Sequence, residues 1–312
     1  MPEPDLGEVL IRVRAVGVCG SDVHWLSKGC IGEEEVKAPG VLGHEFSGQV
    51  GDSNQLVAVD PAINCRVCKY CCEGNPNFCS ALRFAGNPGQ DGALREYVTW
   101  PEHLLYALPE SFTAEDGVML EPLGVALHSL DLAHGFPGMK IAVIGCGPIG
   151  LLVVQLARLT GASEILATDP LQHRLEVARE MGATKIFDTS DGEVDAILAH
   201  TGEGVDVAIE AAGENEAVEV AIGVAKPGAR VVLIGIPPDD RTSFRSSVAR
   251  RNGLTIKLVR RMKHTYPRAI ELVRKGLIEV GSLVTHRFPM KCFEKAFEVA
   301  SKREGLKVII EP

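Results

Sequence analysis

The sequence predicts an α/β fold in which a β-rich first third is followed by a doubly wound parallel sheet. From residue 140 onward, short apolar runs alternate with helical segments, and this order is typical of strands joined by crossover helices. The composition agrees, since 46% of residues are hydrophobic, 33 are glycine and only 5% are aromatic. At 312 residues the chain is long enough for two domains, each with its own core.

The first third predicts strands separated by loops. Residues 8–16 alternate in the manner of a half-buried strand, and residues 96–100 predict another. Glycine and proline are dense between them, up to about residue 91, which favours loops. The pattern changes near Glu121, and His128 lies in a predicted helix.

The rest of the chain predicts alternating strands and helices. Between residues 140 and 234 we expect strands at 140–144, 164–168, 205–210 and 230–234, and helices at 149–160, 172–181 and 216–225. The segment 266–312 predicts two helices and a closing strand at 307–310.

Composition also excludes classes of partner. A formal charge of −9 argues against nucleic acid, whose phosphates need a basic face. No stretch approaches the ~20 apolar residues of a membrane span. The first residues carry neither a basic nor an apolar signal region, so we expect a cytoplasmic protein.

A glycine-rich turn predicts a dinucleotide site. Gly145, Gly147 and Gly150 form G-x-G-x-x-G between a predicted strand and a predicted helix. The first glycine permits a tight turn, the second lets backbone approach a pyrophosphate, and the third lets the helix pack closely on the sheet. The pyrophosphate would lie at the positive end of the helix dipole. The alternative is a purely structural turn. Ile149 and Gly235 complete the expected coenzyme-binding set.

Asp169 favours NAD over NADP. It ends the next predicted strand, about 20 residues further on, where a carboxylate would bind the ribose hydroxyls of adenosine. A 2′-phosphate beside it would be repelled by up to ~4 kcal/mol at an effective dielectric of about 20. Pro170 and Leu171 offer no cation for that phosphate, and Arg174 is placed to cover the adenine face.

Four cysteines predict a structural zinc site. Cys65, Cys68, Cys71 and Cys79 are spaced C-x2-C-x2-C-x7-C in a loop, and four thiolates can close a tetrahedron around one zinc ion. Disulfides or loose thiols are the alternatives, and both are uncommon for clustered cysteines in a reducing compartment. Cys72 is out of step with the spacing.

A second metal site is assembled from separated residues. Cys19 follows the first predicted strand, and His44 and Glu45 follow later in the chain. A thiolate, an imidazole and a carboxylate would leave the fourth position of a zinc ion open, as catalysis requires. The spacing alone fits equally well with Cys19 as a small buried residue and His44 as a core histidine.

These motifs together resemble one family. Cys19 to His24, Gly43-His44-Glu45, the four-cysteine loop, Glu121-Pro122-Leu123 and the glycine-rich turn occur in the order seen in zinc-containing alcohol dehydrogenases of the medium-chain dehydrogenase/reductase superfamily. Glu121-Pro122-Leu123 and residues 285–289 look most like the sorbitol (L-iditol) and related polyol dehydrogenases. The resemblance implies a GroES-like catalytic domain at 1–125, completed by 267–312, and a Rossmann domain at 126–266.

The resemblance also implies roles for individual residues. Cys19, His44 and Glu45 would hold the catalytic zinc, and Glu121 would bind the metal or its water. Asp22 would orient His44. Ser21 and His24 would form a relay for the alcohol proton. Arg261 matches an arginine that contacts substrate.

The chain departs from the family pattern in several places. Met262 follows Arg261 where an aromatic residue is usual, and Trp25 stands in place of a common tyrosine, so we count Trp25 and Arg261 as substrate residues of an altered pocket. A solvated charge in the basic run 260–263 is the alternative for Arg261. We also expect a shortened catalytic barrel, because the chain starts close to the first strand and residues 49–57 are fewer than usual.

The resulting hypothesis is an enzyme with two zinc ions per chain, one catalytic and one structural, that oxidises a small polyhydroxylated alcohol with NAD. Threonine or aldose oxidation on the same scaffold is one alternative, and a zinc-stabilised NAD-binding protein without turnover is another. By analogy we also expect a homotetramer or homodimer.

Overall fold

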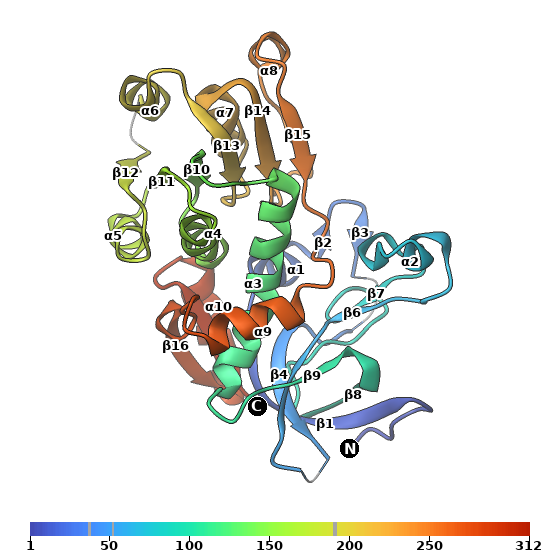
Figure 1. The fold of residues 1–312 in the computed structure, drawn as a ribbon. Helices are drawn as coiled ribbons and strands as arrows, with labels where there is room; N and C mark the ends of the chain where they lie inside the picture. Colours follow the sequence, from blue (N-terminus) through green and yellow to red (C-terminus); the bar gives the residue numbers. More distant parts are fainter. Residues whose placement is uncertain (37–38, 52, 190–191) are drawn as a thin grey trace. The chain divides into compact units, whose positions relative to one another are not determined.

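The computed structural model describes residues 1–36, 39–51, 53–189 and 192–312, which form two compact units (Figure 1). Unit 1 comprises Met1–Gly124 and Lys263–Pro312, and unit 2 comprises Val125–Met262. Helix α3 (Ala114–Ala133) contains the first boundary between them. The second boundary lies directly after Arg261 and Met262.

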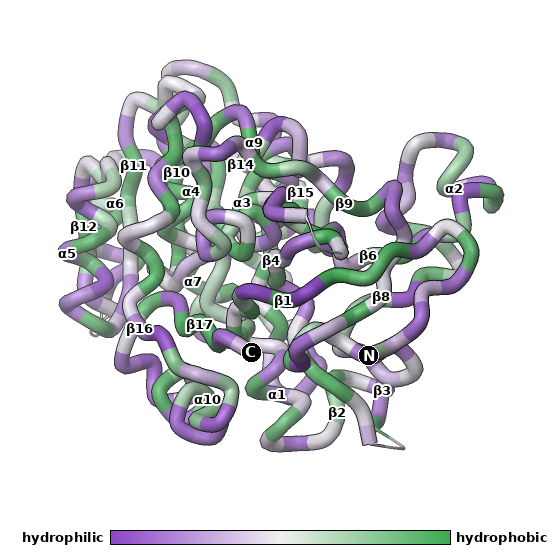
Figure 2. Tube along the Cα trace, turned by 90° about the horizontal axis from the view of Figure 1, so that it is seen from below, coloured by the Kyte–Doolittle hydropathy of each residue, from purple (hydrophilic) through white to green (hydrophobic). Residues whose placement is uncertain are grey.

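Unit 1 is built on a mixed sheet in which β1 is central. The sheet order is β16-β17-β1-β4-β5-β9, and β8 also pairs with β1. The strands are β1 (Glu8–Val18), β4 (Glu45–Val50), β5 (Leu56–Val59), β8 (Tyr97–Pro101), β9 (Leu105–Ala107), β16 (Val284–Pro289) and β17 (Lys307–Glu311). In the middle of β1, Ile11 and Val13 alternate with Arg12 and Arg14, and the apolar pair packs with Phe46 and Trp100 in one core. Figure 2 shows hydrophobic and hydrophilic segments along the trace. The strands expected at 8–16 and 96–100 are therefore confirmed.

Short elements complete unit 1. The helices are α1 (Gly20–Lys28), α2 (Lys69–Cys72), α9 (Tyr266–Arg274) and α10 (Phe293–Ser301), with 3-10 turns at Pro76–Phe78, Glu102–Leu104, Gly281–Leu283 and Met290–Cys292. Two small ribbons pair β2 (Cys30–Ile31) with β3 (Glu34–Glu35) and β6 (Ala62–Ile63) with β7 (Arg83–Phe84). The expected shortening at 49–57 includes Asp52, which lies outside the described residues.

The C-terminal segment contains one strand more than predicted. The two helices and the closing strand are present, but β16 precedes α10 and pairs in parallel with β17. It was missed because it is an edge strand in which Val284 and Phe288 are the main inward apolar residues. Two such residues give little signal of period two.

Unit 2 is a six-stranded parallel sheet of order β12-β11-β10-β13-β14-β15, the doubly wound arrangement that the sequence predicted. Each neighbouring pair is parallel. The strands are β10 (Lys140–Ile144), β11 (Glu164–Asp169), β12 (Lys185–Asp188), β13 (Val205–Glu210), β14 (Ala225–Leu233) and β15 (Thr255–Leu258). The predicted strands at 140–144 and 205–210 are confirmed to the residue.

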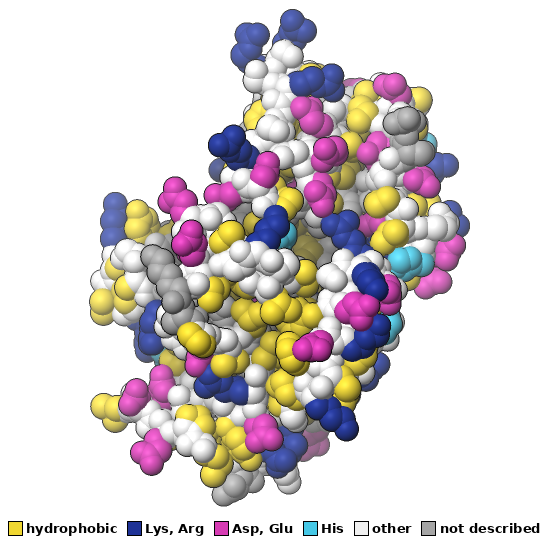
Figure 3. Space-filling model, turned by 180° about the vertical axis from the view of Figure 1, so that it is seen from behind, with side chains coloured by type: hydrophobic (Ala, Val, Ile, Leu, Met, Phe, Trp, Pro, Cys, Tyr) yellow, Lys and Arg dark blue, Asp and Glu magenta, His cyan; other side chains and the backbone are white. Residues whose placement is uncertain are grey.

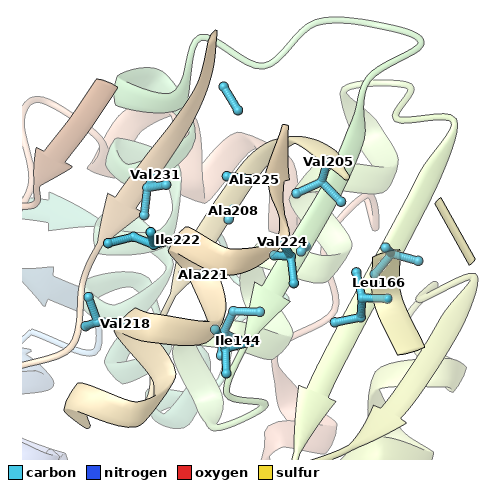
Figure 4. Packing of buried hydrophobic residues seen from close by; sticks show 14 of the residues in the cluster. Ile144, Leu166, Val205, Ala208, Val218, Ala221, Ile222, Val224, Ala225 and Val231 are labelled. Atoms are coloured by element: carbon cyan, nitrogen blue, oxygen red, sulfur yellow. The ribbon is translucent and has the colours of Figure 1, made fainter. Parts of the chain in front are cut away.

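Helices cover both faces of this sheet. They are α4 (Pro148–Leu159), α5 (Gln172–Glu180), α6 (Glu193–Thr201), α7 (Asn215–Val224) and α8 (Ser246–Arg251). Helix α7 buries Val218 and Ile222 in the same core as Ile144 of β10 (Figure 4). Ile197 of α6 and Ala142 of β10 belong to this core as well. On the opposite face, Gly150 of α4 lies over Val143. The helix predicted to run through residue 225 ends at Val224, because β14 begins at Ala225.

Two further features are the hydropathy of the helices and the distribution of charged side chains on the surface. Within the parts of the chain that the structure describes, no helix is both long and apolar enough to cross a bilayer. On the face shown in Figure 3, Lys and Arg side chains are interspersed with Asp and Glu.

Candidate active site and coenzyme site

Cys19, His44 and Glu45 come together in unit 1. Each offers one ligand atom, and these atoms lie within 4.8 Å of one another. Cys19 follows β1 and immediately precedes α1, whereas His44 immediately precedes β4 and Glu45 begins it. Because β1 and β4 are antiparallel neighbours, the end of one strand lies beside the start of the other. The sheet register therefore assembles the three donors.

Asp22 fixes the orientation of His44. Its Oδ1 lies 3.5 Å from His44 Nδ1 and accepts a hydrogen bond from the Gly43 backbone at 3.3 Å, whereas its Oδ2 accepts one from the Cys19 backbone at 3.0 Å. Burial raises the pKa of Asp22, but His44 and these N–H groups outweigh it, so the pKa is lowered and the carboxylate stays charged. With Nδ1 held this way, Nε2 is left for a metal ion.

A buried lysine lies against Glu45. Lys307, the first residue of β17, donates from Nζ to Glu45 Oε2 at 2.5 Å and to the Val18 carbonyl at 3.4 Å. Both charged side chains are almost completely buried. Burial lowers the pKa of Lys307, but Glu45 and Cys19 more than compensate, and the net pKa is raised. Lys307 therefore stays protonated beside the Glu45 carboxyl group.

Gly17 gives Glu45 room for this contact. A Cβ built on Gly17 would lie 2.2 Å from Glu45 Oε2 and 2.8 Å from Val118 Cγ1. Gly17 is opposite Glu45 in the register of β1 with β4, and its neighbour Val18 pairs with Val308 of β17. The carboxylate thus crosses β1 over a residue without a side chain to reach Lys307.

Glu121 is buried near the same charges. It lies in α3, directly before Pro122, and is 6% exposed. Its carboxylate contributes to raising the pKa of both Lys307 and Tyr266. Among the described residues, the group of mutually close ligand atoms that contains His44 comprises Cys19, His44 and Glu45, and does not include Glu121.

The remaining predicted site residues of α1 share one helical face. Ser21 and His24 are three residues apart on α1 and are both partly buried. Trp25, four residues after Ser21, is 5% exposed. Arg261 lies in unit 2 at φ +57°, an uncommon backbone conformation for a residue with a side chain.

The four predicted thiols form a cluster in unit 1. The sulfurs of Cys65, Cys68, Cys71 and Cys79 lie within 4.8 Å of one another, and Cys72 is outside the group. Backbone N–H groups of Cys71 and Ser80 help to lower the pKa of Cys68 to about 6. Burial and the neighbouring thiol of Cys68 raise the pKa of Cys71 to about 12. Deprotonation of all four thiols at this distance would require a cation to offset their charge, and a zinc ion fits this role.

The glycine-rich turn links β10 to α4 in unit 2. Gly145 has φ +96°, and a Cβ on Gly150 would lie 1.9 Å from the Gly145 carbonyl oxygen. Gly147, immediately before the first turn of α4, has open space: its Cβ would meet nothing nearer than Arg174 Nη1 at 3.8 Å. Gly150 therefore serves packing, whereas the backbone at Gly147 is accessible to a ligand at the helix N-terminus.

Asp169 ends β11 and faces the same turn. It accepts hydrogen bonds from the backbone of Cys146 at 2.8 Å and of Leu171 at 2.9 Å. Arg174 is buried, with Nη1 4.0 Å from Asp169 Oδ2. The carboxylate thus ties β11 to the glycine-rich turn, and Arg174 lies beside it. Together they fit the adenosine end of a dinucleotide.

Glu210 is a site residue that the sequence did not reveal. It ends β13, is 1% exposed, and accepts backbone hydrogen bonds from Ala212 at 2.7 Å, Gly213 at 2.6 Å and Gly235 at 3.2 Å. It therefore fixes Gly235, a predicted coenzyme residue, beside the loop after β13. An acidic residue at the end of an apolar strand was the available signal. Lys307 and Gly17 were also missed, because a lone lysine and a strand glycine carry no motif.

Comparison with known proteins gives the same assignment. Residues 5–110 match the family model of the alcohol dehydrogenase GroES-like domain, and residues 148–275 match that of zinc-binding dehydrogenases. Sorbitol dehydrogenase of Bacillus subtilis (strain 168) is 35% identical over 100% of this chain and 93% of its own. A probable D-xylulose reductase A of Emericella nidulans is 37% identical over 97% of this chain and 89% of its own.

A solved structure extends the comparison to coenzyme. A protein of Escherichia coli CFT073 described as a short chain alcohol dehydrogenase, complexed with NADH, aligns with a TM-score of 0.90 and 29% identity. The alignment covers 100% of this chain and 94% of that one.

Fold, donor set and coenzyme loop together define a zinc-binding dehydrogenase, an oxidoreductase whose cofactors are zinc and a nicotinamide dinucleotide. The chain belongs to the zinc-containing alcohol dehydrogenases of the medium-chain dehydrogenase/reductase superfamily, in the group that includes the polyol dehydrogenases.

Proposed function

We propose that this protein oxidises a secondary alcohol of a sugar alcohol to a ketose, with NAD as hydride acceptor and zinc held by Cys19, His44 and Glu45. The observation that carries the proposal is the convergence of the partly buried Cys19 sulfur with the buried, oriented His44 imidazole and the buried Glu45 carboxyl group. Related proteins named sorbitol dehydrogenase and D-xylulose reductase support a polyol substrate.

Different residues of the chain have different roles in the proposed reaction. A zinc ion supplies Lewis-acid activation of the substrate hydroxyl, the effect that lowers the pKa of water from about 15.7 to about 7. Ser21 Oγ accepts the hydroxyl proton while passing its own toward His24, since a hydroxyl can accept and donate in one chain. Asp22 holds His44 in its ligand orientation. Glu121 provides a further carboxylate for the metal or its water.

The coenzyme is assigned to unit 2. Gly145, Gly147, Ile149 and Gly150 receive the pyrophosphate at the start of α4, and Gly235 lines the next loop. Asp169 binds the adenosine ribose and disfavours a 2′-phosphate by repulsion of up to ~4 kcal/mol. Arg174 lies beside it, and Arg261 and Trp25 are the proposed substrate residues. NAD is therefore preferred to NADP.

A substrate panel tests the proposal. Purified protein with zinc is given sorbitol, xylitol, iditol, threonine and aldoses, and NADH formation is followed by absorbance with NAD or NADP. We expect turnover of a polyol with NAD. Cys19→Ala should abolish that turnover while NADH affinity, read by fluorescence, stays near the original value. Preferred oxidation of threonine or an aldose would shift the assignment, and NADH binding without any turnover would overturn it.

We also propose an oligomeric state and a cellular location for this protein. Strand β15 is an edge of the parallel sheet and Leu258 on it is 70% exposed, which favours pairing across a two-fold axis in a homodimer or homotetramer. Sedimentation of a monomer would contradict this. We place the protein in the cytoplasm, where four clustered thiols stay reduced and available to zinc.

A further inference from the structure

The contact between Lys307 and Glu45 joins a buried cation to a proposed metal ligand. The side chains are 4% and 2% exposed, and Nζ to Oε2 measures 2.5 Å. An ammonium group buried without a partner is costly, so the fold retains Lys307 together with an anion. That anion is also one of the three donors within 4.8 Å of one another.

The Glu45 carboxylate can interact with the Lys307 ammonium and with a metal ion at the same time. A carboxylate has two oxygens and about four lone-pair sites, so Glu45 can accept from Lys307 and still offer a lone pair to a metal ion. The ammonium withdraws negative charge from the metal ligand and also repels the divalent ion directly. Both effects weaken binding of the metal at this ligand.

The sheet enforces this arrangement. Lys307 on β17 and Glu45 on β4 lie on opposite sides of β1, and the carboxylate crosses over Gly17. The Val18 carbonyl also accepts from Lys307 Nζ. The ammonium is thus held by the neighbouring backbone as well as by the ligand.

We propose that Lys307 is a positioning residue that shares the Glu45 carboxylate with the catalytic metal ion and keeps it a weak, exchangeable ligand. This inference rests on the proposed function. A weak third ligand keeps a coordination position open for a substrate oxygen, which catalytic zinc sites require.

Metal affinity is the direct test. Lys307→Met removes the charge at similar length. Because the ammonium no longer repels the metal ion, we expect the catalytic site to bind zinc about tenfold more tightly in competition with a chelator. The visible absorption of the cobalt-substituted protein should also change, because a fully bound carboxylate alters the coordination geometry. Lys307→Arg keeps the charge and should resemble the original protein. Lys302→Met removes the same charge from an exposed residue of the C-terminal region and is the matched control.

A Cys19→Ser protein separates the two metal sites. It should hold one zinc ion fewer per chain, and its cobalt spectrum provides the four-cysteine background. Equal zinc content in Cys19→Ser and the original protein would overturn both the proposed function and this inference. If Cys19→Ser loses one zinc ion but Lys307→Met binds zinc with unchanged or weaker affinity, the role proposed for Lys307 is wrong and the proposed function stands. If Lys307→Met does not fold, Lys307→Gln replaces it with the same expected direction.

Discussion

At the scale of single residues, the absence of a side chain at Gly17 determines where the Glu45 carboxylate can lie. The carboxylate occupies the space where a Cβ would be, with Oε2 2.2 Å from that position. A strand glycine normally weakens a sheet, so a glycine here indicates a close approach by another group. That group is a proposed metal ligand.

Gly17→Ala should therefore displace Glu45 and impair the catalytic metal site. We expect zinc content to fall toward one ion per chain, turnover to drop about 100-fold, and the free energy of unfolding to fall by about 1–3 kcal/mol from overpacking. Elemental analysis, initial rates and denaturant unfolding measure these effects. Gly20→Ala, whose Cβ would meet nothing within 4 Å, is the control for zinc content and stability. Unchanged zinc and turnover in Gly17→Ala would contradict the role of Glu45.

Single residues also mark the limit of sequence reasoning. Cys19, His44 and Glu45 were identified because they form recognisable motifs, although spacing alone fitted a small buried cysteine and a core histidine equally well. Lys307 lies 262 residues from Glu45 and belongs to no motif. Its role depends on β17 pairing with β1, which only the folded sheet establishes.

At the scale of elements, the turn from β10 to α4 separates two functions of glycine. A Cβ at Gly150 would overlap the Gly145 carbonyl oxygen, whereas a Cβ at Gly147 would have open space around it. The same substitution should consequently have different effects at the two positions.

Gly150→Ala should lower stability by about 1–3 kcal/mol, because its Cβ would overlap the Gly145 oxygen. Gly147→Ala should leave the melting temperature nearly unchanged but weaken NADH binding about tenfold or more, because a methyl group would occupy the place of the pyrophosphate. Thermal unfolding and NADH fluorescence compare the two variants. Unchanged NADH affinity in Gly147→Ala would refute the proposed pyrophosphate position.

Strand ends in unit 2 are joined by a charge pair whose stabilisation should depend on pH. Asp206 of β13 contacts Lys226 Nζ of β14 at 2.7 Å and accepts from the Lys140 backbone of β10 at 2.8 Å. Burial raises the pKa of Asp206, but Lys226 and the Lys140 N–H outweigh it, and the net pKa falls below the usual 3.8.

A lowered pKa in the folded state means that the stabilisation is present above about pH 4 and is lost as pH falls through the folded-state pKa. Asp206→Asn should therefore cost about 1 kcal/mol at pH 7, since the pair is partly exposed. The difference from the original protein should shrink on acidification below pH ~4. Urea unfolding at several pH values measures this, with Asp240→Asn, on an exposed loop, as the control. A difference that persists unchanged at low pH would contradict the assignment.

At the scale of the whole molecule, different interactions stabilise unit 2 and the four-cysteine loop of unit 1. Unit 2 has an extended apolar core between its sheet and its helices, as Figure 4 shows for one face. The loop that carries the four cysteines in unit 1 has short elements, and Val67, Tyr70 and Phe78 on it are exposed. Such a loop depends on its metal ion, which can contribute on the order of 10 kcal/mol to folding.

Cys68→Ala should thus loosen unit 1 and leave unit 2 nearly unchanged. We expect faster amide hydrogen exchange in residues 65–79 and an earlier first step in thermal unfolding, while β10 and β13 keep their protection. Exchange measured by mass spectrometry locates the effect. Cys72→Ala, an exposed thiol outside the cluster, should show neither change. Equal protection of residues 65–79 in both variants would argue against a structural metal.

The sequence by itself predicted the parallel sheet, the coenzyme turn and the four-cysteine cluster, because strand periodicity, glycine spacing and cysteine spacing are local properties of a chain. Cys19, His44 and Glu45 followed from the family resemblance and not from their spacing alone. Only the tertiary structure decided that Gly17 makes room for Glu45, that Lys307 neutralises it, and that Glu210 joins the loops after β13 and β14. These depend on which strands become neighbours and in what register. Burial then gives the contacts their strength, because a charge removed from water must find its partner within the fold.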